Sequence, residues 1–391
     1  MVNGMVEEIQ DAVEARSAVS AVPTYSDDEC NTMENGDGLE NFAESMPSNQ
    51  DGTLREVPET SQIRLATPEE TASLARESGP PDFIQTYAQY ADVLEAPREM
   101  HEAVAVQVLA TILNKAGVFA RLEGWSFPLD LWIVLLSGSG LGRSTLVQSV
   151  DPVLEMSELK SVVKSSHWGS PQAFYQQMAD HRYGLFVWGE LSVMLKLLNE
   201  SRFTNVKEWL TDRYDSRKIP DQITYVSRGK STDTQPIIFS CAPRINILAT
   251  SSEEWFFQNL ALEDSAGGFV PRWVLIRASD PHKAVPVPPR LDPDLQESLA
   301  LLLLYASELK GEADLSGIRQ PYEEWYRAAQ ARFETQPDQA LARAFFNRHR
   351  GHVLKLAVVY EVSSSLSLNV SCGFRGKAVT IPKLIRSAFR N

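Results

Sequence analysis

The stretch that decides the fold reads LWIVLLSGSGLGRST and spans residues 131–145. Its first half, Leu131 to Leu136, is continuously apolar, which is typical of a strand buried on both faces of a sheet. Its second half is a glycine-rich turn that leads into a helical segment, residues 145–156. A strand, a glycine turn and a helix in this order predict an α/β unit with a functional loop at the carboxyl end of the strand.

The glycine-rich turn approximates the phosphate-binding pattern G-x-x-x-x-G-K-[ST]. Glycines let the backbone wrap a phosphate group with several N–H groups pointing inward, and the following helix N-terminus adds partial positive charge. The Ser144 hydroxyl is then placed to bind Mg²⁺. A ligand-free strand–helix turn is the alternative. The predicted nucleotide-binding residues are Gly138, Ser139, Gly140, Leu141, Gly142, Arg143, Ser144 and Thr145.

Two positions of the turn depart from that pattern. Ser137 replaces the first glycine, which is a mild change, and Arg143 replaces the lysine. Arginine keeps the positive charge but presents a longer, planar and forked group, whereas lysine delivers a compact point charge to the β- and γ-phosphates. A site that binds nucleotide but hydrolyses it slowly or not at all is therefore a second interpretation.

A second apolar strand ends in an acid, because residues 185–190 read LFVWGE. In phosphoryl-transfer sites with this layout an Asp–Glu pair closes the strand: the Asp holds the hydrated Mg²⁺ and the Glu polarises the attacking water. Gly189 stands where that Asp is expected, and Glu190 keeps the catalytic position. We predict Glu190 as both a catalytic and a metal-binding residue. The alternative is that Glu190 only caps the following helix, residues 191–198.

Two further segments supply candidate catalytic residues. Residues 245–252, INILATSS, form a strand that ends in hydroxyl side chains, so Thr250 or Ser251 is placed to sense a γ-phosphate; a plain turn at the strand end is the alternative. In GGFVPRW, residues 267–273, a glycine turn presents Arg272 at the start of a strand. Such an arginine can stabilise transition-state charge in a neighbouring subunit. A surface arginine paired with a carboxylate is the alternative.

Charge divides the chain into an acidic head and a nearly neutral body. Residues 1–80 hold 17 acidic and 4 basic residues, whereas the other 311 hold 34 acidic and 33 basic residues. Almost all of the net charge of −14 therefore lies in the first 80 residues. The head is too poor in apolar residues to offset its ordering entropy, which predicts a disordered acidic tail. A partner-docking segment or a mimic of nucleic-acid charge is the alternative. We predict a nucleotide-binding core with a helical lead-in over 81–284 and a helical C-terminal subdomain over 285–391.

The body alternates between strand and helix patterns, so the predicted fold class is α/β with a mainly parallel sheet and an all-α C-terminal region. The candidate strands are 118–122, 129–136, 161–163, 185–188, 236–239, 245–249 and 273–276. The candidate helices are 82–94, 100–116, 145–156, 171–180, 191–198, 204–214, 294–309, 322–335, 339–363 and 382–390.

Composition excludes several classes of protein. The charge excludes a basic protein that coats nucleic acid by charge alone. Three distant cysteines exclude a disulfide scaffold, and the six histidines and three cysteines lack metal-ligand spacing. The longest apolar run has eight residues, too short to span a membrane, and no signal peptide is visible. We therefore expect a cytoplasmic protein without a membrane partner.

Taken together, these segments resemble a group of P-loop ATPase domains of uncharacterised function. The group occurs in phage, plasmid and mobile-element proteins, is often fused to primase modules and is regarded as helicase-like. The resemblance runs from about Pro81 to Phe389. It rests on the order and spacing of FPLDLWIVLLSGSGLGRST, GLFVWGEL, KEWLTDRYDS, INILATSS, GGFVPRW and FFNRHRGHVLKLA. Members usually carry Lys at the position of Arg143 and Asp at that of Gly189.

The resemblance implies a RecA-like or AAA+-like P-loop NTPase that binds ATP and Mg²⁺. It implies a ring-shaped homo-oligomer acting on DNA in phage or mobile-element replication, with a primase partner in trans. The sensor role of Thr250 and the trans-acting role of Arg272 rest partly on it. The competing hypotheses are a degenerate nucleotide-binding subunit for assembly or regulation, and an interaction protein that binds no nucleotide.

Two basic segments are candidates for nucleic-acid contact. In the predicted helix 339–363, Arg348, His352 and Lys355 share one face by steps of four and three residues, beside Arg343, His349 and Arg350. A solvated face paired with acids is the alternative. The second segment, in a predicted hairpin or loop, holds Arg213, Arg217, Lys218, Arg228 and Lys230.

Overall fold

The computed structural model describes residues 82–138, 143–164, 166–224, 236–260, 264–265, 267–277, 284–287 and 289–369. The predicted acidic tail and the predicted helix 382–390 lie outside these residues. The side chains of residues 143, 144, 147, 204 and 367–369 also lie outside the description.

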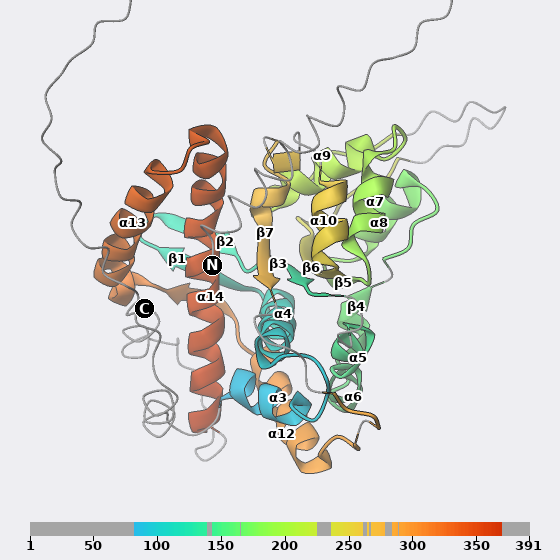
Figure 1. Ribbon diagram of the computed structural model, residues 1–391, viewed down its shortest axis with the longest axis vertical. Helices are drawn as coiled ribbons and strands as arrows, with labels where there is room; N and C mark the ends of the chain where they lie inside the picture. Colours follow the sequence, from blue (N-terminus) through green and yellow to red (C-terminus); the bar gives the residue numbers. More distant parts are fainter. Residues whose placement is uncertain are drawn as a thin grey trace, which may run out of the picture. The chain divides into compact units, whose positions relative to one another are not determined.

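A five-stranded sheet with all strands parallel lies at the centre of the fold (Figure 1). Its spatial order is β4-β5-β6-β3-β7. The strands are β3 (Trp132–Leu136), β4 (Val163–Lys164), β5 (Tyr183–Trp188), β6 (Arg244–Ser251) and β7 (Trp273–Arg277). The α/β class with a parallel sheet is therefore confirmed.

Continuous apolarity in β3 reflects burial on both faces of the sheet. Ile133 and Leu135 join a core cluster with α3 (Phe83–Ala91), α4 (Arg98–Ala116) and α12 (Pro293–Ser307). Trp132, Val134 and Leu136 alternate to the other face and join a second cluster. That second cluster packs under α7 (Pro171–Asp180), α8 (Leu191–Asn199), α9 (Thr204–Arg213) and α10 (Glu253–Asn259). Figure 1 shows these two groups of helices on opposite sides of the sheet.

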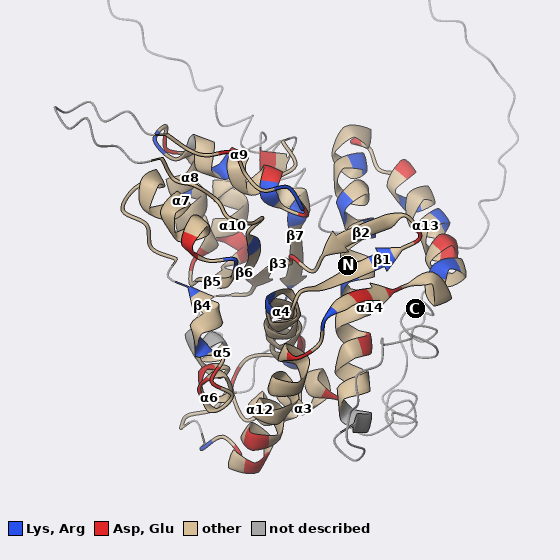
Figure 2. Cartoon of the chain, turned by 180° about the vertical axis from the view of Figure 1, so that it is seen from behind, with Lys and Arg blue, Asp and Glu red and all other residues tan. Residues whose placement is uncertain are grey.

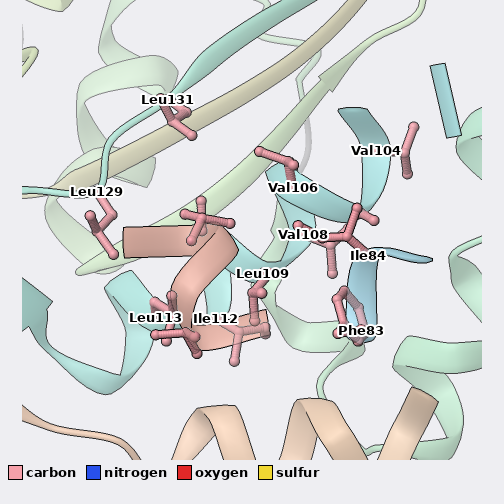
Figure 3. Close-up of a cluster of buried hydrophobic side chains, with 14 of the residues drawn as sticks. Phe83, Ile84, Val104, Val106, Val108, Leu109, Ile112, Leu113, Leu129 and Leu131 are labelled. Atoms are coloured by element: carbon pink, nitrogen blue, oxygen red, sulfur yellow. The ribbon is translucent and has the colours of Figure 1, made fainter. Parts of the chain in front are cut away.

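Helix α4 is the buried helix beneath the sheet. Fourteen of its 19 residues are buried, and it contacts β3, β5, β6 and β7. Figure 3 shows Val108, Leu109 and Ile112 of α4 in the same cluster as Phe83 of α3 and Leu131 before β3. The helix ends at Gly117, whose φ of 84° lies in the left-handed region that favours glycine at a C-cap.

A second, three-stranded sheet has the order β2-β1-β8. Strands β1 (Val118–Leu122) and β2 (Trp125–Pro128) form an antiparallel hairpin, and β8 (Gly311–Asp314) pairs in parallel with β1. The prediction of an all-α C-terminal region was therefore wrong. Three of the four residues of β8 are exposed or half-buried, so the strand has no apolar run. Its strand conformation therefore depends on pairing with β1 and not on its own sequence pattern.

Two long helices, α13 (Arg319–Glu334) and α14 (Gln339–Asn369), pack against each other beside the small sheet (Figure 1). Helix α14 also contacts α3, α4 and α12. The region after residue 285 therefore packs on the helical lead-in as well as on itself. None of the described helices is long and apolar enough to cross a membrane.

Three further element predictions were wrong. The strand expected over 161–163 is largely a 3-10 helix, Lys160–Val162, and only Val163 belongs to β4. The single helix expected over 145–156 is two helices, α5 (Arg143–Gln148) and α6 (Asp151–Met156), because Pro152 lacks the N–H that would continue the first helix. The strand expected over 236–239 is only an isolated bridge between Ile237 and Ile223.

Candidate functional site

The carboxyl ends of the central strands meet at one edge of the sheet. Leu136 at the end of β3 is in register with Ser251 of β6 and with Arg277 of β7. Trp188 at the end of β5 is in register with Ala249 of β6. The turns that follow β3, β5 and β6 therefore share this edge, which we call the carboxyl edge. In open parallel sheets, ligands bind outside the carboxyl ends of the strands, where the strand order reverses.

Strand β3 lies at such a reversal. The chain passes from β3 to β4 at one side of the sheet, works back through β5 and β6, and then crosses to β7 on the far side of β3. The glycine-rich turn follows β3 directly. Ser137 and Gly138 are described, whereas Ser139, Gly140, Leu141 and Gly142 and the side chains of Arg143 and Ser144 are not. Thr145 is exposed on α5.

Glu190 is held in place by hydrogen bonds from Ser192 and Ser251. It is the N-cap of α8, where its Oε1 accepts a hydrogen bond from the Ser192 N–H at 3.2 Å. The Ser251 hydroxyl donates to the same oxygen at 2.5 Å, and the Ser192 and Ser251 hydroxyls lie 2.8 Å apart. Ser192 and Ser251 are fully buried, whereas Glu190 is half-buried. The capping role is thus confirmed, and it fixes the carboxylate at the carboxyl edge.

The same strand ends connect Glu190 to the start of the glycine-rich turn. The Ser137 N–H donates to the Ser251 carbonyl at 3.2 Å. Next to Ser251, the buried Thr250 hydroxyl donates to the Gly189 carbonyl at 2.5 Å. Of the two hydroxyls that the sequence offered as sensors, Ser251 contacts the candidate catalytic carboxylate and Thr250 contacts the backbone beside it.

Gly189 has open space around it. A Cβ built on this exposed glycine would meet no atom within 4 Å, and its φ lies outside the left-handed region. An aspartate therefore fits at this position without strain. A pocket of about 580 Å³ opens beside Gly189 and Glu190. Its other walls include Trp168, Trp188, Val193, Met194 and Leu197.

One ion pair at the carboxyl edge was not predicted. Arg277, at the end of β7, binds Glu253 at the start of α10 through two contacts of 2.9 and 2.8 Å. The side chains are 45% and 29% exposed. The available signal was that Arg277 ends one strand of the parallel sheet and Glu253 follows another, but the sequence does not reveal that β7 and β6 flank β3.

Arg272 lies at the opposite edge of the sheet, at the start of β7. Its side chain is buried, so the alternative of a surface arginine was wrong. The guanidinium donates to the Gly268 carbonyl, and a Cβ at Gly268 would come within 2.8 Å of it. Burial and the nearby charge of Arg348 lower the pKa of Arg272 to about 10. The structure does not bring Arg272 together with Glu190 within the chain.

A buried polar network occupies that opposite edge. Lys355 of α14 is fully buried; its Nζ pairs with the Asp215 carboxylate, donates to the Asp130 carbonyl and lies 4.0 Å from the Tyr214 ring centre. The Arg244 guanidinium lies 3.7 Å from the Asp130 carboxylate. Burial raises the pKa of Asp130 to about 6 against the lowering effect of both cations.

This network changes the interpretation of the basic segment in α14. His352 is 4% exposed and Lys355 is 0% exposed. Neither is available to nucleic acid on a surface, and neither belongs to a solvated face, so both sequence-based interpretations were wrong for these two residues. Burial and neighbouring cations hold the pKa of His352 well below its ordinary value, which keeps the imidazole neutral.

The described residues contain no group of three His, Cys, Asp or Glu side chains arranged to hold a metal ion. Glu190 is linked through Ser251 to the turn residue Ser137. A hydrated Mg²⁺ bound mainly by phosphate oxygens needs only one or two protein ligands, so the residue set remains compatible with it. Neither a scan against protein-family models nor a search of curated proteins found a match for this chain.

Proposed function

We propose that this chain is a helicase-like P-loop ATPase that binds ATP and Mg²⁺ and acts on DNA. The observation that supports it best is the sheet order β4-β5-β6-β3-β7 with Glu190 held at the carboxyl edge. This order puts the strand before the glycine-rich turn at the reversal point. The acid-ending strand β5 is separated from that strand by β6 alone.

Each residue at the edge has a proposed role. The N–H groups of the glycine-rich turn and Arg143 hold the phosphates, and Ser144 binds Mg²⁺. Glu190 is the proposed base that polarises the attacking water, and its half-buried carboxylate opens onto the pocket beside α8. Ser251 and Ser192 orient that carboxylate, so the base does not have to be reorganised during the reaction.

The trans-acting role of Arg272 is left out of this proposal. Its guanidinium is buried and already bound to the Gly268 carbonyl, so it would have to be uncovered before it could reach a neighbouring subunit. A ring of copies of this chain, and a primase partner in trans, stay predictions that follow from the resemblance.

A nucleotide-binding protein with little or no hydrolysis is the second candidate. It is favoured by Gly189, which supplies no carboxylate to Mg²⁺ next to Glu190, and by Arg143 in place of lysine. In this case the same edge binds nucleotide, and the protein serves as an assembly or regulatory subunit.

Calorimetric titration with ATP and Mg²⁺, followed by a steady-state ATPase assay, tests both candidates. The wild-type chain is compared with Gly189→Asp, Arg143→Lys and the double variant. Glu190→Gln is the control, because it keeps the size of the side chain and removes the base. We expect wild-type turnover that falls at least tenfold in Glu190→Gln while ATP binding is retained.

The outcomes separate the two candidates. Turnover in the double variant but not in the wild type would refute the ATPase proposal and support the non-hydrolysing subunit. Absence of ATP binding in every variant would refute both. Raising Mg²⁺ should narrow the gap between wild type and Gly189→Asp, because added metal compensates for a weak metal site but not for a missing base.

A further inference from the structure

A second pocket, far from the carboxyl edge in the fold, lies between the β1–β2 hairpin and the two long helices. It measures about 450 Å³. Trp125 of β2 forms one wall, Tyr322, Tyr326 and Arg327 of α13 form another, and Arg350 of α14 closes it. Figure 1 shows the hairpin, α13 and α14 side by side. We call this cavity the Trp125 pocket.

The aromatic wall of the Trp125 pocket is accessible to solvent. Trp125 is 42% exposed, and its ring meets Phe127 edge-on at 5.3 Å. The Arg350 guanidinium lies 5.2 Å from the centre of the Trp125 ring. A large aromatic side chain left in water beside a planar cation is a surface on which another flat ring can stack.

The acids at the pocket are already paired. Glu323 lines the pocket and binds Arg319 at 2.9 Å and Arg327 at 3.3 Å. Arg319 also binds Glu123 at 2.9 Å, so three arginines, Arg350 included, face two carboxylates. Figure 2 shows both charges intermixed on α13 and basic residues on the upper part of α14. Of the residues that line the pocket, Arg327 and Arg350 are basic and Glu323 is acidic, so the lining carries a net positive charge.

A further arginine lies on the other face of the hairpin. Arg217, from the segment after α9, is exposed and donates to the Ser126 hydroxyl at 3.0 Å, next to Trp125 in the chain. Its guanidinium also lies 4.6 Å from the ring of Phe119 in β1. Because successive side chains of a strand point to opposite faces, Ser126 and Arg217 lie on the face of the hairpin opposite Trp125, and Arg217 does not line the pocket.

We propose that the Trp125 pocket binds a base of single-stranded nucleic acid, with the neighbouring phosphates on Arg350 and Arg327. Each base has a flat face that can stack on tryptophan, and its phosphates complement the arginines. In a duplex the base faces are covered by their neighbours, so this site favours single strands. The inference rests on the proposed function, since an ATPase acting on nucleic acid has to hold it outside the nucleotide site.

Fluorescence anisotropy with the full chain and no nucleotide tests the site. The probes are a labelled single-stranded DNA, the same sequence as RNA, and the DNA duplex. Trp125→Ala should weaken single-strand binding about 5- to 150-fold, the range for loss of one stacked base, and Trp125→Phe should retain most of it. Arg350→Ala should weaken binding and reduce the salt dependence by about one phosphate contact.

Matched controls come from the same chain. Trp255 is another exposed tryptophan, at 51%, and Arg202 is another exposed arginine, with its guanidinium 5.2 Å from the Phe203 ring centre. Trp255→Ala and Arg202→Ala should each change the affinity less than twofold. A loss of affinity in either control as large as that in Trp125→Ala would overturn the assignment of the pocket.

Crosslinking provides a readout that does not depend on how a variant folds. An oligonucleotide with a photoreactive base should crosslink to the wild-type chain at Trp125, Tyr322 or Tyr326, as located by mass spectrometry. Crosslinks only elsewhere, equal affinity for the duplex, or full displacement by an acidic peptide at equal charge concentration would each overturn the proposal. Preference for DNA or RNA identifies the nucleic acid.

Because no nucleotide is present, the two proposals can fail separately. Binding at Trp125 by a chain that hydrolyses no ATP would refute the ATPase and support the pocket. Turnover by a chain that binds none of the three probes would support the ATPase site and refute both the pocket and action on nucleic acid.

Discussion

Replacement of Lys355 by methionine tests the buried network at the edge of the sheet opposite Glu190. Lys355→Met keeps the approximate length of the side chain and the packing of its aliphatic part but removes the charge. The wild-type ammonium is 0% exposed and contacts the Asp215 carboxylate, the Asp130 carbonyl and the Tyr214 ring. The variant loses all three contacts, which leaves the Asp215 carboxylate and the Asp130 carbonyl without this partner.

The expected cost follows from what is left unpaired. Removing one partner of a buried ion pair costs about 3–5 kcal/mol, because the other charge is left without compensation. The Asp215 side chain is 29% exposed and gains some hydration, which places the expected loss near the lower end, about 3 kcal/mol. At roughly 2–4 °C per kcal/mol for a domain of this size, the melting temperature should fall by about 6–12 °C.

Urea unfolding followed by circular dichroism measures this loss, with Lys160→Met as the control. Lys160 also pairs with an aspartate, Asp151, but is 38% exposed, so its loss should cost less than about 1 kcal/mol. Asp215→Asn added to Lys355→Met should recover part of the loss, because it removes the uncompensated charge. A cost below about 1 kcal/mol for Lys355→Met, or strictly additive losses in the double variant, would refute the reasoning.

Three further predictions concern stability. His101 is 0% exposed, and burial lowers its pKa to about 4. Only the unfolded chain therefore takes up a proton at this residue as the pH falls below about 6.5, so the free energy of unfolding should drop by about 2 kcal/mol between pH 7 and 5. His101→Leu should remove most of this pH dependence in urea unfolding experiments. Ser251→Ala removes a hydroxyl donor to the Glu190 carboxylate and should cost about 1.5–3 kcal/mol in thermal unfolding. Gly117→Ala forces a side chain to a φ of 84° with open space around it, so calorimetry should show a loss of about 1–2 kcal/mol from the backbone alone.

The sequence predicts the centre of the parallel sheet well because β3 and β6 are buried on both faces. Strand β3, all five residues of which are buried, has the uninterrupted apolar run expected of such a strand. By contrast, β2 and β8 are not predicted, because Trp125 and Glu312 are exposed and neither strand has alternating apolar and polar residues. Their strand conformation depends on β1, which in the case of β8 lies far away in the sequence.

Part of the candidate site is also predictable. Because the strands of an α/β sheet run parallel, acids and hydroxyls that follow successive strands gather at one edge, which brings Glu190 and Ser251 together. The network at the other edge has no such rule. Lys355 contacts Asp130 across 225 residues, and no spacing in α14 distinguishes a lysine that is buried from one that is solvated.

Gly189, which stands in place of the Asp expected before Glu190, leaves the proposed base undisturbed. Packing does not require glycine at position 189, since a Cβ there meets no atom within 4 Å. Glu190 is held by Ser192 and Ser251, and neither contact involves the side chain at 189. The missing aspartate therefore removes a metal ligand and leaves the proposed base where it was. The two functional candidates then differ in how tightly the site holds Mg²⁺ around the phosphates, and the architecture of the carboxyl edge serves either of them equally.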